Sequence, residues 1–304
     1  MTSPSEAPIE RVLKLDQVAA DAFRNAEPLY KPAGARGVFG GCVVSQSLMA
    51  AIKTVPLKYE VHSMHCYFIL AGDSDIPIVY QVEHVREGRS YCTRTVEAMQ
   101  NNRCIFTTTI SFQLPAPDEL THAPVYPGPP LVPPPEQAIK YEDYVMAILK
   151  KGQISNRIAM LDAQSAAALP TEYRLVAPDT SEAPPQEKKQ YLWVKARGKI
   201  QDPKAHAMAL AYFSDNLFLG QSVRSHGIMF FDVSMMVSLD HIIYFHAPFK
   251  ADEWLLYEMV SPWAGCGRGL SYGRLFSQDG TLVASVIQEG VVRLKKNAAA
   301  KAKM

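Results

Sequence analysis

The sequence predicts an α+β protein built from two modules in tandem, each consisting of a helix that lies on an antiparallel sheet. The first observation behind this prediction is a repeat, since residues 61–68 (VHSMHCYF) and 237–245 (VSLDHIIYF) share Val, His, Tyr and Phe in the same order. The second is that each copy begins a similar succession of strand-like runs with a Gly-Arg turn among them. A duplicated module often builds one site at the junction of its copies.

The first module is expected to begin with a helix over 42–55, which Gly40 and Gly41 precede. Apolar residues recur there at helical spacing, and Pro56 prevents easy continuation. Runs rich in β-branched and aromatic residues then predict an antiparallel meander. Its strands are expected at 60–70, 77–86, 90–99 and 103–114.

The middle of the chain reads as a connector, because prolines crowd residues 115–135 and another polar, Pro-containing stretch covers 171–190. One helix is expected within it, near 141–150. The predicted organisation is an N-terminal module at 1–115, a connector at 116–190, a C-terminal module at 191–294 and a tail at 295–304.

The helix of the second module has clearer signals. Asp202 suits the N-cap, and Pro203 suits the first helical position. An apolar stripe follows, formed by Ala205, Met208, Ala209, Tyr212 and Phe213. A stripe of this kind should pack on a sheet, and its strands are expected at 235–245, 253–261, 268–277 and 282–294.

Length and composition exclude several classes of protein. The 304 residues suffice for two modules that each bury a core, and 31 basic against 30 acidic residues leave no nucleic-acid footprint. Five cysteines without a CxxC pair predict reduced, buried, inert thiols in an intracellular compartment. No apolar stretch reaches the roughly 18 residues of a membrane span, and the N-terminus lacks the features of a signal peptide.

The C-terminal residues 295–304 (KKNAAAKAKM) form a basic, Ala-rich tail. The tail ends in Ala302, Lys303 and Met304, which is similar to a peroxisomal address of the Ser-Lys-Leu type but differs at its first and last positions. We therefore expect a peroxisomal protein whose C-terminus is read by an import receptor. A cytoplasmic location is the alternative.

Asp215 stands just past the apolar stripe of the second helix, where we expect it to reach the edge of the sheet. A carboxylate is poorly placed there, because the C-terminus of a helix already carries partial negative charge. One interpretation is a solvated acid at a helix end. The other is a general base held near water.

Two more polar residues stand out on predicted strands. Gln288 shares a face with apolar neighbours, so its amide either makes a structural hydrogen bond or orients a water or a carbonyl group. Ser238 and Asp240 are expected to face one way and His241 the other. Ser238 either donates to a water or a substrate oxygen or serves structure alone, and no GxSxG motif supports an activated serine.

The histidines and glycines carry weaker signals. His62 and His65, like His241 and His246, are separated by odd numbers of residues, which on a strand puts them on opposite faces, so no metal site is expected. The glycines around Arg268 predict a β-turn rather than a phosphate loop. Backbone N–H groups at the Gly-Gly pair before the first helix could stabilise negative charge on a carbonyl oxygen, or the pair could be a tight packing turn.

Four segments, in this order and spacing, resemble the type II acyl-CoA thioesterases, the TesB-like family of double hotdog proteins. They are Phe39, Gly40 and Gly41 before a helix, 212–217 (YFSDNL), 238–246 (SLDHIIYFH) and 288–293 (QEGVVR). The likeness runs from about Leu13 to Leu294. It implies that each module is a hotdog, a helix wrapped by an antiparallel sheet, and the peroxisomal members of the family fit the C-terminal tail.

By the same resemblance, the family's catalytic triad falls on Asp215, Ser238 and Gln288. The triad would hold a water that attacks the thioester carbonyl of a fatty acyl-CoA, with Asp215 as the general base and no metal or redox cofactor. The oxyanion would be received by backbone groups of the first module at Gly40, Gly41 and Cys42.

Two other functions stay open. Hotdog modules also serve as non-catalytic acyl-CoA binding proteins and as enoyl-thioester hydratases. A hydratase would prefer an Asp and His pair near a glycine-led helix, which neither expected helix start offers. The exposed edges of such sheets often pair, so a homo-oligomer is also expected.

Overall fold

The computed structural model describes residues 6–32, 34–117, 119–128, 131–151, 169–176 and 181–296. The first half contains α1 (Pro8–Val12), β1 (Leu15–Ala19), β2 (Ala22–Asn25), α2 (Gly40–Ile52), β3 (Glu60–Phe68), β4 (Val79–Glu87), β5 (Tyr91–Gln100) and β6 (Arg103–Gln113). The middle contains η1 (Pro135–Gln137), β7 (Ile139–Lys140), α3 (Tyr141–Lys150), β8 (Thr171–Leu175), η2 (Pro185–Glu187) and β9 (Lys189–Ala196). The second half contains α5 (Ala205–Ser214), α6 (Gln221–Arg224), η3 (Phe230–Asp232), β10 (Val233–Ser238), β11 (Asp240–Phe245), β12 (Leu255–Gly265), β13 (Arg268–Ser277) and β14 (Leu282–Leu294).

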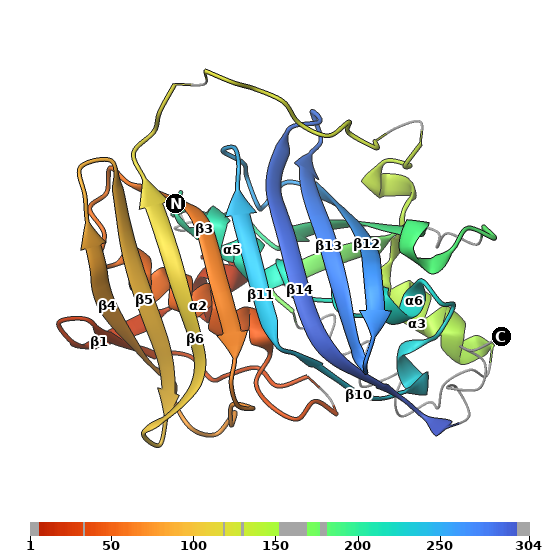
Figure 1. Cartoon of the computed structure of the whole chain (residues 1–304), viewed down its shortest axis with the longest axis horizontal. Coiled ribbons are helices and arrows are strands. Elements are labelled where there is room, and N and C mark those ends of the chain that lie inside the picture. The colour runs from red at the N-terminus through yellow and green to blue at the C-terminus, as the bar shows by residue number, and fades with distance from the viewer. Residues whose placement is uncertain are drawn as a thin grey trace, which may run out of the picture.

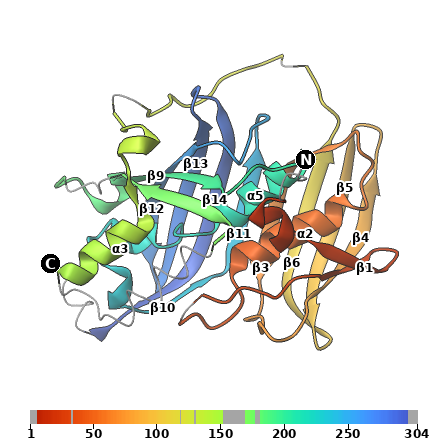
Figure 2. The same cartoon turned by 180° about the vertical axis from the view of Figure 1, so that it is seen from behind.

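One broad, curved antiparallel sheet faces the viewer in Figure 1, and α2 and α5 lie side by side behind it, as the reverse view in Figure 2 shows. Its strand order is β1-β2-β4-β5-β6-β3-β11-β14-β13-β12-β9-β8-β7, and β10 also pairs with β14. The predicted α+β fold, with two helix-on-sheet modules in tandem, is therefore confirmed.

The two repeated segments meet at the centre of the sheet. They form β3 and β11, which pair antiparallel in a register that sets Ile242 opposite His65 and Ile243 opposite Met64. The copies therefore face each other about an approximate two-fold axis between these strands. This pairing joins the sheet of one module to the sheet of the other.

The core beneath the helices is continuous across both modules, which corrects the expectation of a separate core in each. Buried residues from α2, α5 and both halves of the sheet form one cluster, in which Val44, Leu48, Met208 and Tyr212 have at most 1% of their surface exposed. The apolar stripes predicted for the two helices are therefore what attaches them to the sheet.

The two predicted helices of the modules exist, but their ends differ from the expectation. Gly40 and Gly41 are the first residues of α2 rather than a turn before it, and α2 ends at Ile52, before Val55. The second helix begins at Ala205, not at Pro203, although Asp202 Oδ1 still accepts a hydrogen bond of 2.9 Å from the backbone N–H of Lys204. Its capping contact thus belongs to the turn that leads into α5.

Several elements were missing from the sequence expectation. The strands β1, β2 and β9 were not predicted, and β7 and β8 lie inside the range read as a connector. β8 pairs with β9 from Thr171 opposite Ala196 to Leu175 opposite Leu192, so part of that range extends the sheet. The helix expected near 141–150 is confirmed as α3. The domain boundaries stay a prediction, and the C-terminal residues 302–304 lie outside the described residues.

The cysteines follow the expectation only in part. Cys42, Cys66 and Cys92 are buried free thiols, and burial raises the pKa of Cys42 and of Cys66 to about 12. Cys266 is exposed, because it lies in the tight turn between β12 and β13 with a positive φ of 49°. The expected β-turn is therefore present there, but one thiol in it reaches solvent.

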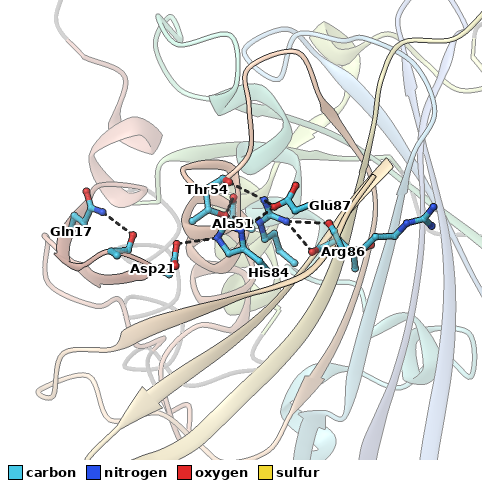
Figure 3. A network of polar contacts seen from close by, with 10 residues as sticks. Gln17, Asp21, Ala51, Thr54, His84, Arg86 and Glu87 are labelled. Carbon is cyan, nitrogen blue, oxygen red and sulfur yellow. Dashed lines mark hydrogen bonds and ion pairs between the residues drawn. The ribbon is translucent and has the colours of Figure 1, made fainter. Parts of the chain in front are cut away.

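A buried arginine fixes the end of α2 on the sheet. Arg94 on β5 is fully buried, and its guanidinium donates to both the hydroxyl and the carbonyl oxygen of Thr54, each at 3.0 Å. It also contacts Glu87 at 2.6 Å, Glu87 contacts His84 at 3.0 Å, and His84 lies 3.1 Å from Asp21 (Figure 3). The chain that leaves α2 is thus attached to β4 and β5 through one side chain.

The two long helices approach closely at Gly41. A Cβ built on Gly41 would overlap the backbone carbonyl of Tyr212 in α5 and would lie 2.6 Å from the ring of Phe39. The rings of Phe39 and Tyr212 pack edge to face with centroids 5.0 Å apart. Glycine is therefore needed here for space, which supports the packing interpretation of the pair.

We expect Gly41→Ala to lower the free energy of unfolding by about 2 kcal/mol, because the Tyr212 carbonyl belongs to a helix and can move only if α5 shifts. Chemical denaturation of both proteins measures the change. Gly72→Ala is the matched control, since its Cβ would meet only the end of the Ile105 side chain, at 3.1 Å, which can move aside, so the change should stay within about 0.5 kcal/mol. Equal stability of the two variants would contradict the packing role of Gly41.

Candidate active site

The three polar residues singled out in the sequence meet in space. Gln288 lies on β14, and its Nε2 donates 2.7 Å hydrogen bonds to Asp215 Oδ1 and to Ser238 Oγ. Asp215 is the residue directly after α5, and Ser238 is the last residue of β10. Since β14 is an interior strand of the sheet, the expectation that Asp215 lies at the sheet edge is wrong. The end of α5 points over the centre of the sheet instead.

Two opposing effects act on the ionisation of Asp215. Burial raises the pKa of Asp215 above its usual range, while hydrogen bonds from Gln288 and from the backbone of Gly41 lower it. A carboxylate whose pKa is raised in this way is a stronger proton acceptor than a solvated aspartate. This combination suits a general base.

The first module contributes to the same site. A Cβ on Gly40 would lie only 2.7 Å from Asp215 Oδ2 and 3.0 Å from the ring of Phe68, so a side chain there would displace the carboxylate. The site therefore lies at the junction of the two modules, between the start of α2 and the end of α5.

The expected oxyanion groups lie at this junction but are engaged. The backbone of Gly41 hydrogen-bonds to Asp215, and the N–H of Cys42 donates to the carbonyl of Phe39 at 3.1 Å. The oxyanion role of Gly40, Gly41 and Cys42 stays a prediction. In the present geometry the positive end of α2 acts on the Asp215 carboxylate.

One expectation about side-chain direction is wrong. The predicted strand 235–245 is interrupted at Leu239, where the register against β14 shifts: Ser238 lies opposite Gly290 in β10, and Ile242 lies opposite Ile287 in β11. This extra residue changes the alternation of faces, as β-bulges do. Ser238 and His241 therefore both reach Gln288, although simple alternation put them on opposite faces.

His241 is the neighbour of the site that sequence reasoning missed. It is fully buried, and its Nε2 lies 2.9 Å from the hydroxyl of Ser214, the residue before Asp215. Among the described residues, neither His241 Nδ1 nor Gln288 Oε1 meets full hydrogen-bond geometry with any group. Gln288 nevertheless acts on His241, because its side chain raises the pKa of the histidine against the larger effect of burial. No feature of the sequence indicates this contact, because the contact depends on the bulge at Leu239.

His241 gives a test of the site by pH. Burial lowers the pKa of His241 to about 3, whereas an unfolded histidine titrates near pH 6.5. A histidine of depressed pKa stabilises the fold above pH 6.5, and this contribution is lost as pH falls from 6.5 toward 3.

We therefore expect the free energy of unfolding of His241→Asn to fall less steeply with decreasing pH than that of the unmodified protein. Thermal unfolding between pH 7.5 and 5 measures the two slopes, which should differ by about one bound proton. Asn keeps a donor close to the position of Nδ1. His65→Asn serves as the control, because His65 lies on β3 on an exposed part of the surface. Parallel pH curves for His241→Asn and the unmodified protein would contradict the depressed pKa.

The other histidines do not gather into a ligand set. His62 Nε2 lies 2.7 Å from the hydroxyl of Ser111, and His246 Nε2 lies 2.9 Å from that of Ser285. Within the described part of the chain, no three His, Cys, Asp or Glu residues are arranged to hold a metal ion. The same part contains no helix long and apolar enough to cross a membrane.

Comparisons with known proteins agree on one family. A model of the acyl-CoA thioesterase N-terminal domain matches residues 28–113, and a model of the C-terminal domain matches residues 156–292. Acyl-coenzyme A thioesterase 8 of Homo sapiens is 42% identical over 291 residues, which cover 94% of this chain and 89% of the human protein. Peroxisomal acyl-coenzyme A thioester hydrolase 1 of Saccharomyces cerevisiae is 28% identical over 330 residues, covering 93% and 94%. Among solved structures, the acyl-CoA thioesterase II TesB2 of Mycobacterium marinum matches with a TM-score of 0.73 and 34% identity, covering 95% of this chain and 98% of that one.

Proposed function

The chain belongs to the type II, TesB-like acyl-CoA thioesterases and is an acyl-CoA thioester hydrolase with the double hotdog fold, and we propose that Asp215, Ser238 and Gln288 carry out the hydrolysis of its fatty acyl-CoA substrate. One observation supports this most directly. The Gln288 amide nitrogen lies 2.7 Å from both the Asp215 carboxylate and the Ser238 hydroxyl.

In the proposed mechanism Asp215 is the general base. It removes a proton from a water molecule while the water oxygen attacks the thioester carbonyl carbon. The tetrahedral intermediate then loses the sulfur, and the proton held by Asp215 passes to the leaving CoA thiolate. The products are a free fatty acid and CoA, and no covalent enzyme intermediate forms.

Gln288 and Ser238 position the reacting groups in this proposal. Both N–H bonds of the Gln288 amide are used, one for Asp215 and one for Ser238, which keeps the carboxylate and the hydroxyl in fixed relation. Since the Ser238 oxygen accepts from Gln288, its own O–H remains available to donate to the water or to the substrate oxygen. Positioning of this kind lowers the entropic part of the barrier.

The test is the release of free CoA thiol from a panel of acyl-CoA esters of increasing chain length, with the fatty acid product identified by mass. We expect turnover of at least one ester, and the panel then identifies the preferred chain. If the esters bind but release no thiol, the protein binds acyl-CoA without hydrolysing it, and the proposed roles of the three residues are wrong.

A second candidate reaction is hydration of an enoyl thioester. The sequence offered no Asp and His pair near a glycine-led helix, but the structure puts Asp215 at the start of α2 and links His241 to the adjacent Ser214. His241 is neutral at physiological pH and buried, which argues against its acting as the acid or base. Loss of enoyl-thioester absorbance without thiol release would favour this reaction.

We also propose that the protein acts in the peroxisome through the C-terminal residues Ala302, Lys303 and Met304. The resemblance of this tripeptide to a peroxisomal address supports the proposal, as does the 28% identity to the yeast peroxisomal hydrolase. A fluorescent protein fused in front of residues 295–304 should enter peroxisomes, and a fusion that lacks the last three residues should not. A diffuse signal from both fusions would favour the cytoplasmic alternative.

A further inference from the structure

A cavity of about 720 Å³ lies at the ends of α2 and α5 that are remote from Asp215. Ile52 at the end of α2 and Val55 just beyond it line the cavity, as do Lys204 and Ala207 at the start of α5. Asp215, in contrast, follows the end of α5 and lies at the start of α2. The volume of the cavity is within the range of about 300–1,000 Å³ that small-molecule sites occupy.

The approximate two-fold axis between β3 and β11 relates this cavity to the active site. The active site combines the start of α2, the end of β3 at Phe68 and the start of the repeated segment at Ser238. The cavity combines the start of α5, the end of β11 at Phe245 and the start of the other repeated segment at His62. Duplication therefore produced two equivalent pockets, one at each end of the helix pair.

The second pocket lacks the groups that the proposed hydrolysis needs. The residue after α2, which corresponds to Asp215 after α5, is Lys53. The position that corresponds to Ser238 holds His62, and its ring nitrogen is engaged by the Ser111 hydroxyl at 2.7 Å. The position of the general base is thus held by Lys53, which is exposed and does not line the pocket, and the position of the serine by a histidine. The pocket can bind but is not built to hydrolyse.

The lining of the pocket combines an apolar wall with polar groups and with Lys204 at the start of α5. Partly exposed apolar side chains form its wall, namely Ile52, Val61, Ala207, Phe245 and Phe249. Lys204 has no ion-pair partner among the described residues, and Lys250 lies 3.3 Å from Glu253 at the surface. The positive end of the α5 dipole lies here as well, with the carboxylates of Asp202 and Glu10 accepting hydrogen bonds from the backbone of the turn before it.

The other titratable groups in the lining leave Lys204 as its one unpaired lysine within the described part of the chain. Glu60 is the one carboxylate among the described lining residues, and Lys250 is paired with Glu253. Burial lowers the pKa of His62, His206 and His246, so these rings are neutral at physiological pH. An apolar wall next to the ammonium group of Lys204, which is unpaired in the described ranges, suits a ligand with an apolar chain and one anionic end.

We propose that this second pocket binds a long-chain fatty acid, with its carboxylate at Lys204 and its chain along the apolar wall. The ligand class follows from the lining of the pocket and does not depend on the roles proposed for Asp215, Ser238 and Gln288. The protein thus has one pocket for reaction and one for retention of an amphipathic anion.

Photoaffinity labelling with a diazirine-bearing palmitate, followed by mass mapping of the labelled peptides, tests the proposal. We expect labels on peptides that contain residues 203–207 and 245–250, in the unmodified protein and in Asp215→Asn alike. Excess palmitate should remove these labels, and excess CoA should not. Labels confined to peptides around Asp215, or protection by CoA in place of palmitate, would overturn the site or the ligand class, respectively.

Two variants separate binding from folding. Lys204→Glu should weaken palmitate binding, measured by calorimetry, by about tenfold, because it exchanges a favourable ion pair for a repulsion. Ala207→Trp should fill the pocket and remove the labels at 203–207. Lys140→Glu is the charge-matched control on the exposed strand β7 and should bind palmitate as the unmodified protein does. Unchanged affinity in Lys204→Glu would contradict the proposal.

The hydrolysis assay keeps this inference distinct from the proposed function. A protein that is labelled in the second pocket but releases no thiol retains the fatty-acid site and loses the proposed reaction. A protein that releases thiol but is labelled only near Asp215 retains the reaction and loses the second site.

Discussion

Replacing Asp215 by Asn is expected to lower kcat for acyl-CoA hydrolysis by about 10²–10⁴-fold, the range that general-base catalysis contributes. Asn retains the size of the side chain and can still accept the Gln288 N–H through its oxygen, so the contact with Gln288 should be kept while the hydrogen bond from the Gly41 backbone is weakened. The loss should therefore fall on kcat, with KM little changed. Thiol release measured at equal folded concentration gives both values.

The pH profile provides a second readout of the same substitution. Burial raises the pKa of Asp215, and hydrolysis needs the ionised form, so activity should rise as pH increases through a value above that of an ordinary aspartate. The residual activity of Asp215→Asn should lack this acid limb. His241 does not supply the limb, because its pKa of about 3 keeps it neutral over that range.

Asp279→Asn is the matched control. Asp279 lies in the turn between β13 and β14, where its carboxylate is bonded by Ser277 and by the backbone of Thr281. The same change of atoms there should leave kcat within about twofold, as is usual for surface sites. If Asp215→Asn retains the activity of this control, Asp215 is not the base.

The second large effect is expected for Gln288→Glu, with a loss of about 10²-fold in kcat, the size of effect seen when one positioned donor is removed. The substitution keeps the shape of the side chain but exchanges the donating nitrogen for an acceptor oxygen. Both the Asp215 carboxylate and the Ser238 hydroxyl then lose the N–H that holds them at 2.7 Å.

The direction of the pH effect distinguishes this role from a structural one. A second carboxyl group beside Asp215 makes ionisation of both groups unfavourable, so the acid limb of the activity profile should move to higher pH. A Gln288 that only fills space would give a smaller kcat without that displacement. Gln190→Glu, on β9 and bonded to the carbonyl of Val176 at 3.1 Å, is a control for the same change at a buried structural amide.

Residues whose role depends on local pattern could be predicted from the sequence. The helix over Tyr141–Lys150 and the strands over Arg268–Ser277 and Leu282–Leu294 lie where apolar periodicity and turn residues put them. Gln288 was recognised because alternation along an uninterrupted strand reliably assigns a polar side chain to an apolar face. These features depend only on neighbours within a few residues.

Features that depend on distant parts of the chain were mistaken or missed. The strand β8 is only five residues long, and it is defined by its pairing with β9, which in turn pairs with β12. His241 was assigned to the wrong face because one irregular residue, Leu239, changes the alternation, and the pairing of β10 and β11 with β14 decides where that irregularity falls.

The sequence by itself determined that the chain duplicates a helix-on-sheet module and which three polar residues are unusual for their positions. Only the tertiary structure decided that β3 pairs with β11, that Gly40 leaves room for the Asp215 carboxylate, and that the duplication leaves a second pocket without a base. The physical reason is that local pattern follows from backbone geometry and burial within one element. The meeting of Gly40 with Asp215 follows instead from packing between segments 175 residues apart (215 − 40).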